Sequence, residues 1–198
     1  MNNNYIFLIV GESGCGKTTI VKQLEHKYGL VSIQSYTTRP KRTNSESGHI
    51  FVTEAEFDNL TNMVAYTLFN NYRYCATVEQ VEHSDLYVID PKGVNYFLEN
   101  YKGNKTPKII YINTDLSVRY ERMKTRAEEN GVPFIQAVNQ SLERIKNDVV
   151  EFYDYIHNNA PVDFKVKNND EDIDSVVRKV YEYICSCNVN SCEKQENE

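Results

Sequence analysis

Short apolar runs alternate along the chain with segments of helical periodicity. Three runs have the length and flanking residues of buried parallel strands: residues 5–10, 86–90 and 108–113. Helical patterns follow these runs over residues 17–28, 91–101 and 115–126. Strands that alternate with helices in this way predict an α/β fold with a parallel sheet and right-handed crossovers.

Other segments have patterns that fit less directly into such a sheet. Residues 30–34 alternate apolar and polar side chains, which predicts a second strand. Three further segments are typical of strands in a small mixed subdomain: residues 50–52, 63–69 and 73–79. A long helical pattern covers Ile135 to Ile156, a last strand is expected over 162–166, and a helix with one apolar face follows Asp170. Residues 187–198 are polar and charged, which predicts a disordered tail.

Composition and charge exclude several classes of protein. The 198 residues are 40% hydrophobic, which suffices for one core of ordinary size. A net charge of −6 argues against a broad surface for nucleic acid or membranes. No apolar run approaches the ~18 residues that a membrane span needs. The five cysteines are odd in number and lack framework spacing, so a reduced, cytoplasmic protein is expected.

The strongest motif follows the first predicted strand. Residues 11–18, GESGCGKT, match G-x-x-x-x-G-K-[ST], with a strand before and a helix after, as a phosphate-binding loop requires. The backbone N–H groups of such a loop converge on phosphate oxygens, Lys17 can reach the β- and γ-phosphates, and the Thr18 hydroxyl can bind Mg²⁺. The expected ATP-binding residues here are Gly11, Glu12, Ser13, Gly14, Cys15, Gly16, Lys17, Thr18 and Thr19. Cys15 stands at a helix N-terminus, where the pKa of a thiol tends to fall.

A second cationic segment comes shortly after the loop. Residues 35–42, SYTTRPKR, hold three cations and several hydroxyl groups, and Pro40 rules out a helix through them. Arg39 and Arg42 can each grip a phosphate through paired hydrogen bonds, which lysine cannot imitate. A solvated basic loop is the alternative interpretation. Because a phosphate-binding loop precedes it, we interpret the segment as a clamp for a second phosphate-bearing substrate.

With these two motifs the sequence resembles the guanylate kinase family. SYTTRPKR is similar to the monophosphate-binding signature of that family, and the resemblance continues through Glu46-Ser47-Gly48, Tyr74, 89–93 and the segment from Arg119 to Arg126. It implies a P-loop NTPase fold, in which helices flank a parallel-sheet core. On this basis residues 1–186 are predicted to form one domain. Its expected parts are a core (1–35, 85–125 and 145–186), a monophosphate-binding insert (36–84) and a lid (126–144).

The resemblance also implies roles for individual residues. The acceptor monophosphate and its neighbourhood would be held by Ser35, Arg39, Arg42, His49, Tyr74 and Asp90. Lys17, Arg39, Arg126 and Arg144 would act on the transferring group, the last two from the lid. Asn168 would lie near the adenine of ATP. The connection between Arg126 and Arg144 is longer than usual for the family, so the position of Arg144 in the alignment is open.

The chain departs from the family where the base is read. Ala65 stands at the position of an acidic residue that accepts hydrogen bonds from guanine, and Ala76 at that of a hydroxyl residue. His49 replaces a phosphate-binding tyrosine, and Val88 an aspartate. A site that forms hydrogen bonds with its substrate rejects analogues that cannot form them. The substitutions remove such groups, so they predict weak guanine selectivity or a different acceptor.

These observations predict an ATP- and Mg²⁺-dependent nucleoside monophosphate kinase that phosphorylates GMP or dGMP. One alternative is a kinase for another nucleoside monophosphate or for ribose 1,5-bisphosphate. Another is an inactive guanylate-kinase-like domain that binds peptides. Gly16, Lys17 and Thr18 are intact, which favours an enzyme over the second alternative. The expected partners are ATP and a nucleoside monophosphate, without nucleic acid or membrane.

Overall fold

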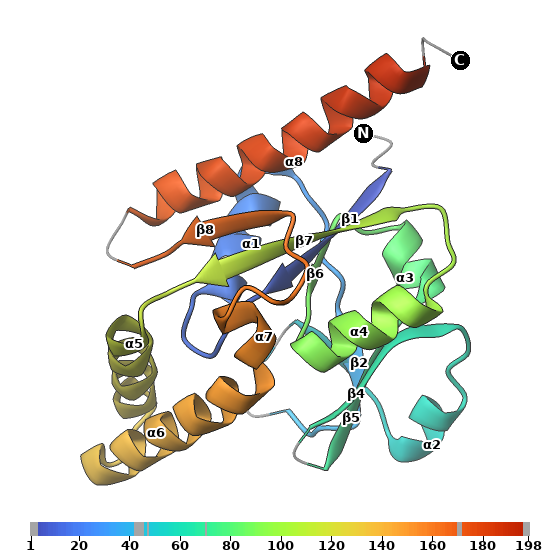
Figure 1. Ribbon diagram of the computed structural model, residues 1–198. Helices are drawn as coiled ribbons and strands as arrows, with labels where there is room; N and C mark the ends of the chain where they lie inside the picture. Colours follow the sequence, from blue (N-terminus) through green and yellow to red (C-terminus); the bar gives the residue numbers. More distant parts are fainter. Residues whose placement is uncertain (1–3, 42–45, 47, 70, 170–171, 196–198) are drawn as a thin grey trace.

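In the computed structural model, the described residues (4–41, 46, 48–69, 71–169 and 172–195) form two four-stranded sheets with helices packed around the first (Figure 1). The first sheet has the order β6-β1-β7-β8, and its strands are all parallel. The strands are β1 (Tyr5–Val10), β6 (Leu86–Val88), β7 (Thr106–Asn113) and β8 (Phe164–Lys167). The predicted α/β class with a parallel sheet is confirmed.

Alternating side chains of β1 enter two separate cores. Ile6, Leu8 and Val10 face one core, which is completed by α3 (Val78–Glu82), α4 (Pro91–Asn100) and α7 (Tyr153–Ile156). Phe7 and Ile9 face the other core, beneath α1 (Lys17–Tyr28) and α8 (Ile173–Gln195). Because both faces are covered, β1 is apolar along its whole length, as the sequence pattern indicated.

The predicted tail is helical over most of its length. Helix α8 continues to Gln195, so the expected disorder of 187–198 is wrong as far as that residue, and 196–198 lie outside the described residues. The chain holds no Gly or Pro after Pro161 to stop the helix, and Cys187 still packs against the core beneath it. The start at Asp170 also lies outside the described residues; α8 begins at Ile173.

Helices α5 (Leu116–Glu129) and α6 (Phe134–Glu151) pack against each other beyond the end of β7 (Figure 1). Gly131, at φ 81°, makes the turn between them. The single helix expected over 135–156 is two helices in the structure, because the chain bends at Phe152. Phe152 and Tyr155 are buried under the sheet, so tertiary packing accounts for the bend without Gly or Pro.

The second sheet has the order β3-β2-β5-β4. Its strands are β2 (Ser35–Thr37), β3 (His49–Phe51), β4 (Met63–Phe69) and β5 (Tyr72–Thr77), and helix α2 (Glu54–Asp58) follows β3. Strands β2 and β3 pair in parallel and the other pairs are antiparallel. The strand predicted at 30–34 is wrong, since only Ser32 forms a bridge, to Leu86, and β2 starts at Ser35. In this segment Ile33 is buried and Val31 is half exposed. The alternation of apolar and polar residues in the sequence therefore does not reflect a strand with one buried face.

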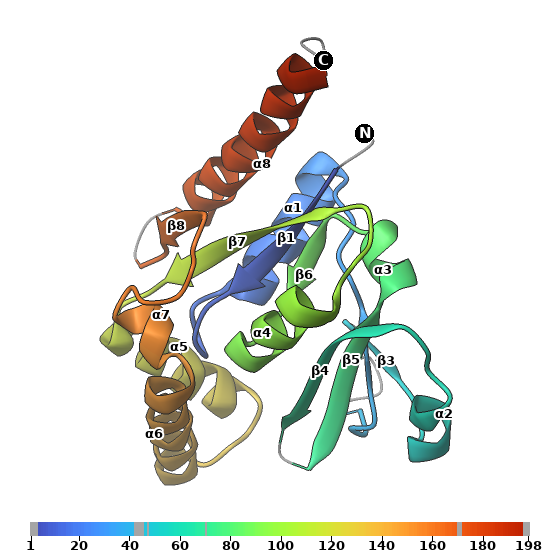
Figure 2. The ribbon, with the colours of Figure 1, turned by 45° about the vertical axis from the view of Figure 1, so that its right-hand side comes forward.

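Figure 2 shows how the two sheets and the paired helices are arranged. In both views α5 and α6 lie on one side of the end of β1, and the second sheet lies on the other side. The loop that follows β1 therefore faces both. The carboxyl ends of parallel strands are where open α/β sheets bind ligands.

Candidate active site

The loop between β1 and α1 has the backbone that its glycines allow. Gly14 (φ 80°) and Gly16 (φ 96°) are in left-handed conformations. A Cβ atom on Gly16 would lie 2.5 Å from Nδ2 of Asn168, and one on Gly14 would lie 2.7 Å from the carbonyl oxygen of Arg119. Both positions therefore require glycine for conformation and for space.

Lys17 begins α1 and turns back over the loop. Its ammonium group donates to the carbonyl oxygen of Gly11 and, at 3.2 Å, to that of Glu12. Thr18 and Thr19 are exposed on the first turn of the helix. The cation and the first helical N–H groups thus lie together at the helix N-terminus, which is an arrangement that attracts anions.

The environment of Cys15 differs from the sequence-based expectation. Its side chain is fully buried in the core beneath α1 and α8. Burial raises the pKa of the thiol, and this outweighs the opposing effect of the nearby Lys17 ammonium. The expectation of a lowered pKa is therefore wrong, and Cys15 serves as part of the core.

Glu12 also points inward. Its carboxylate is 3% exposed, accepts a hydrogen bond of 2.9 Å from the Tyr111 hydroxyl and lies 3.6 Å from the guanidinium of Arg119. Burial and the neighbouring Glu12 raise the pKa of Tyr111. Of Glu12, only the backbone is available to a ligand on the loop.

Asn168 supports the loop from behind. It is 2% exposed, and its Nδ2 donates to the carbonyl of Cys15 at 2.8 Å. Arg122 in turn donates to the carbonyls of Asn168 and Asn169 and so fixes the segment after β8. The predicted place of Asn168 near adenine stays a prediction.

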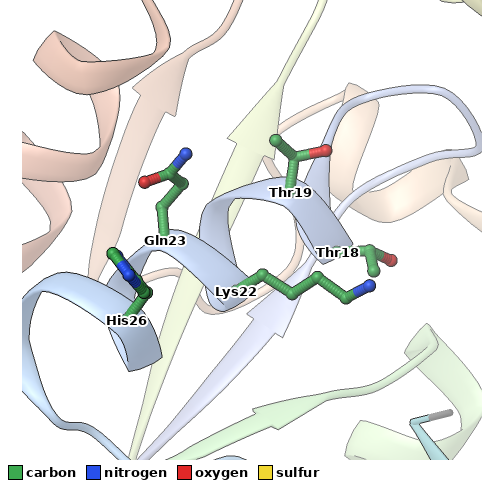
Figure 3. Close-up of a pocket in the computed structure, with 5 residues that line it drawn as sticks. All are labelled: Thr18, Thr19, Lys22, Gln23 and His26. Carbon is green, nitrogen blue, oxygen red and sulfur yellow. The ribbon is translucent and has the colours of Figure 1, made fainter.

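A hollow with a volume of about 320 Å³ lies along α1, and Figure 3 shows the side chains that line it. It is lined by Thr18, Thr19, Lys22, Gln23 and His26, and the side chain of Lys22 extends toward Thr18. All five side chains come from one helix, so the hollow brings no distant residues together. A larger cleft, which Lys17 lines, does.

That larger cleft has a volume of about 610 Å³. Its walls include Lys17 from the loop, Tyr74 from β5, Asp90 after β6, Arg126 from α5 and Arg144 from α6. Gly11 and Ser13 of the loop line it too, so the structure brings seven of the predicted site residues to one space, although they come from five separate segments. A volume in this range is typical of sites for small molecules.

Predicted acceptor residues cluster at the edge of the second sheet. The Ser35 hydroxyl lies 2.9 Å from Nδ1 of His49. The His49 ring packs edge-on against Tyr74, with 5.7 Å between centroids. Strand register places Ser35 opposite His49, while Tyr74 lies opposite Thr37, two residues further along β2, and reaches His49 through the ring contact.

Arg39 extends from the same sheet and is 8% exposed. Its guanidinium binds both carboxylate oxygens of Glu46, at 2.7 and 3.3 Å, and lies 5.5 Å from the centroid of the Phe51 ring. The hydrogen bonding that Arg39 donates to Glu46 is the main cause that raises the pKa of Arg39, and Tyr74 has a smaller effect in the same direction. Glu46 occupies the fork that a phosphate would use. Arg42 lies outside the described residues.

Asp90 caps α4 and meets the second sheet. Its Oδ1 accepts from the backbone N–H of Gly93 at 2.7 Å and from the hydroxyl of Thr67 at 3.3 Å. Thr67 lies opposite Tyr74 in the β4–β5 pair. The sequence analysis missed Thr67; its polar side chain two residues after Ala65 on a predicted strand was the available signal.

Sequence reasoning also missed two acids on α6 that line the cleft, Asp148 and Glu151. Burial, and then the charge of Asp90, raise the pKa of Glu151. Both acids follow Arg144 at helical spacing, on the face that turns toward the cleft, and this spacing was the signal available in the sequence. Arg119, which binds Asp148, was missed as well.

The part of the chain that the structure describes has neither a cluster of metal ligands nor a membrane-spanning helix. Among the described residues, no three or more His, Cys, Asp or Glu side chains form a group that could hold a metal ion. In that part of the chain, helices long and apolar enough to cross a bilayer are absent.

Fold and loop define the chain as a P-loop protein of the α/β class. A family model described as an AAA domain matches residues 7–146. A guanylate kinase of Mycoplasma genitalium is 30% identical over 179 residues, covering 82% of this chain and 72% of that protein. One from Francisella tularensis is 25% identical over 174 residues, covering 78% and 87%.

The chain belongs to the guanylate kinase family, as the motifs predicted. A likeness of fold agrees with this: the crystal structure of guanylate kinase from Anaplasma phagocytophilum matches with a TM-score of 0.53. That match covers 94% of this chain and 87% of the other, at 14% identity.

Proposed function

We propose that this protein is a nucleoside monophosphate kinase that transfers the γ-phosphate of ATP to GMP or dGMP. The observation that carries the proposal is the cleft shared by Lys17, Tyr74, Asp90, Arg126 and Arg144. Such a transfer needs two phosphate-bearing substrates in line and neutralised charge, with little covalent work by the protein.

The ATP phosphates would lie on the loop of residues 11–18. Lys17 would exchange its contacts with loop carbonyls for the β- and γ-phosphates, and Arg126 and Arg144 would approach the transferring group from the lid helices. Mg²⁺ would be held by the Thr18 hydroxyl, a hard oxygen donor on the exposed first turn of α1, and would neutralise phosphate charge.

The acceptor phosphate would lie near Ser35, His49 and Tyr74. Arg39 would bind it in the bidentate manner in which it now binds Glu46, so the Glu46 carboxylate marks a place suited to a phosphate. The acceptor sugar and base would extend toward Asp90 and Thr67.

The cleft has acids beside its cations, and their arrangement limits repulsion of phosphate. Asp148 pairs with Arg119 at 2.9 Å, and Asp90 accepts two hydrogen bonds. Burial raises the pKa of Glu151, which favours its uncharged form. Glu143, which is exposed, also lines the cleft, so Lys17, Arg126 and Arg144 would have to outweigh its charge at the phosphoryl group.

A different acceptor base is the second candidate, and the pair Ala65 and Ala76 favours it. Both side chains are buried and apolar at the positions where the resemblance implies guanine-reading groups, and Val88 lines the cleft. The phosphate-binding residues would then serve an acceptor whose base makes fewer hydrogen bonds.

The proposal is tested by following the label of [γ-³²P]ATP with Mg²⁺ and GMP or dGMP. Transfer of label to the nucleoside diphosphate is expected. Label released only as inorganic phosphate would contradict a kinase. Label that stays on ATP with GMP and dGMP would contradict these acceptors. If it also stays on ATP with the other nucleoside monophosphates, the inactive binding domain is favoured.

A further inference from the structure

Three charged side chains are buried together beside the phosphate-binding loop. Glu12, Arg119 and Asp148 are 3%, 3% and 5% exposed. They come from the loop, from α5 and from α6. Burying charges is costly unless they are paired with good geometry. The three side chains therefore favour one arrangement of the loop, α5 and α6.

Arg119 holds the group together. Its NH1 atom lies 2.9 Å from Oδ2 of Asp148 and 3.4 Å from the carbonyl oxygen of Ser13, and its NH2 atom lies 3.6 Å from Oε1 of Glu12. One guanidinium therefore contacts the loop twice and α6 once. A lysine could not reach these three groups with a single ammonium.

Asp148 is bound directly to the loop as well. It accepts the backbone N–H of Ser13 at 2.9 Å and the Ser13 hydroxyl at 3.1 Å. These contacts join residues 135 positions apart in the chain. They fix the first half of the loop to α6 and leave the N–H groups nearer α1 for a ligand.

The same two helices carry the arginines that face the cleft. Arg144 precedes Asp148 by one helical turn on α6, and Arg126 follows Arg119 by two turns on α5. A displacement of either helix relative to the loop would move these arginines relative to Lys17. Small misplacements of this kind reduce transfer rates strongly.

We propose that Arg119 and Asp148 are positioning residues, which fasten the helices carrying Arg126 and Arg144 to the phosphate-binding loop. The inference rests on the proposed function, since the fastening matters for transfer between two nucleotides. Arg119 also neutralises two carboxylates that would otherwise repel ATP phosphates from the loop.

The test uses the full chain with Asp148→Ala, and Lys146→Ala on the exposed face of α6 as the matched control. For Asp148→Ala we expect kcat to fall about 10–100-fold while the KM for the acceptor changes little. Amide hydrogen exchange over residues 11–16 should rise about 10-fold or more, with α8 unchanged. The control should behave as the unmodified protein.

A variant that keeps the fold separates positioning from stability. Glu12→Gln/Arg119→Met/Asp148→Asn removes all three charges with little change in volume, so it should fold. We expect its kcat to fall as well. Normal kcat in this folded variant, or unchanged exchange of the loop in Asp148→Ala, would overturn the inference.

The exchange measurement needs no acceptor. A chain that phosphorylates nothing would contradict the proposed function, while the loop exchange would still decide whether Asp148 fastens the loop.

Discussion

Ala65 lies directly opposite Ala76 in the antiparallel pair of β4 and β5, and both side chains are buried, at 2% and 0% exposure. Two methyl groups thus lie side by side at the positions where the resemblance to guanylate kinases implies an acidic and a hydroxyl residue. A site without these groups loses the penalty that rejects other bases.

We therefore predict weak selectivity for guanine. The kcat/KM for GMP should exceed that for other nucleoside monophosphates by about 10-fold at most, against the 10⁴-fold or more that hydrogen-bonded sites reach. Ala76→Ser and Ala65→Glu should each raise the relative use of GMP, with Ala65→Gln as the uncharged control. Because Ala65 is buried, melting temperatures must accompany the rates. Efficient use of GMP with rejection of AMP, CMP, UMP and TMP by the unmodified protein would show this prediction to be wrong.

A second prediction concerns Lys17. Its ammonium contacts only loop carbonyls and the neighbouring thiol among the hydrogen bonds of the described residues, so Lys17→Ala should leave the fold intact. If Lys17 stabilises charge on the transferring group, kcat should fall about 10²–10³-fold. Steady-state rates and circular dichroism of the purified variant check this. Turnover close to that of the unmodified protein would contradict the role of the loop in transfer.

Arg39 allows a test of the acceptor side. Arg39→Lys keeps the positive charge and removes the fork that now holds Glu46. We expect kcat/KM for the monophosphate to fall about 10–100-fold, with the KM for ATP within about twofold. Arg73→Lys, which changes an arginine paired with Glu54 and Asp58 away from the cleft, is the matched control. A larger loss on the ATP side would mean that Arg39 serves the other substrate.

The raised pKa of Glu151 predicts how stability depends on pH. The folded state favours the protonated carboxyl, so the unfolded state binds fewer protons as pH rises above the ordinary value of 4.5, and stability falls through that window. Glu151→Gln should therefore stabilise the protein at pH 7, and the gain should vanish as pH approaches 4.5. Denaturant titrations at several pH values check this, with the exposed Glu143→Gln as control. A gain that persists at low pH would exclude ionisation as its cause.

The sequence was sufficient to predict those parts of the fold that are determined by residues close to one another in the chain. Strand β1, the glycine loop and α1 follow one another, so the motif in residues 5–28 was sufficient to place them. The helix predicted over 115–126 was likewise local, and α5 (Leu116–Glu129) covers most of that range. The bend at Phe152 and the start of β2 at Ser35 were not local, because packing under the sheet decides the first and pairing of Ser35 with His49 of β3 decides the second.

In the candidate site, too, the residues of local motifs were predictable and those placed by long-range contacts were not. Lys17 and Arg39 belong to motifs with fixed spacing. The role of Arg119 and Asp148 could not be predicted, because it depends on their contacts with Ser13 and Glu12. These contacts join residues more than 100 positions apart, such as Ser13 and Asp148. The Cys15 thiol points into the core that α8 covers. This packing could not be predicted from the residues around the loop.

The most direct test of the account is a measurement of phosphoryl transfer from Mg·ATP to a panel of acceptors. The panel consists of GMP, dGMP, AMP, CMP, UMP, TMP and ribose 1,5-bisphosphate, each with the unmodified protein and with Lys17→Ala. The account predicts a diphosphate product from at least one nucleoside monophosphate, with the rate lowered in the variant. Transfer to ribose 1,5-bisphosphate alone, or to no acceptor by folded protein, would contradict it.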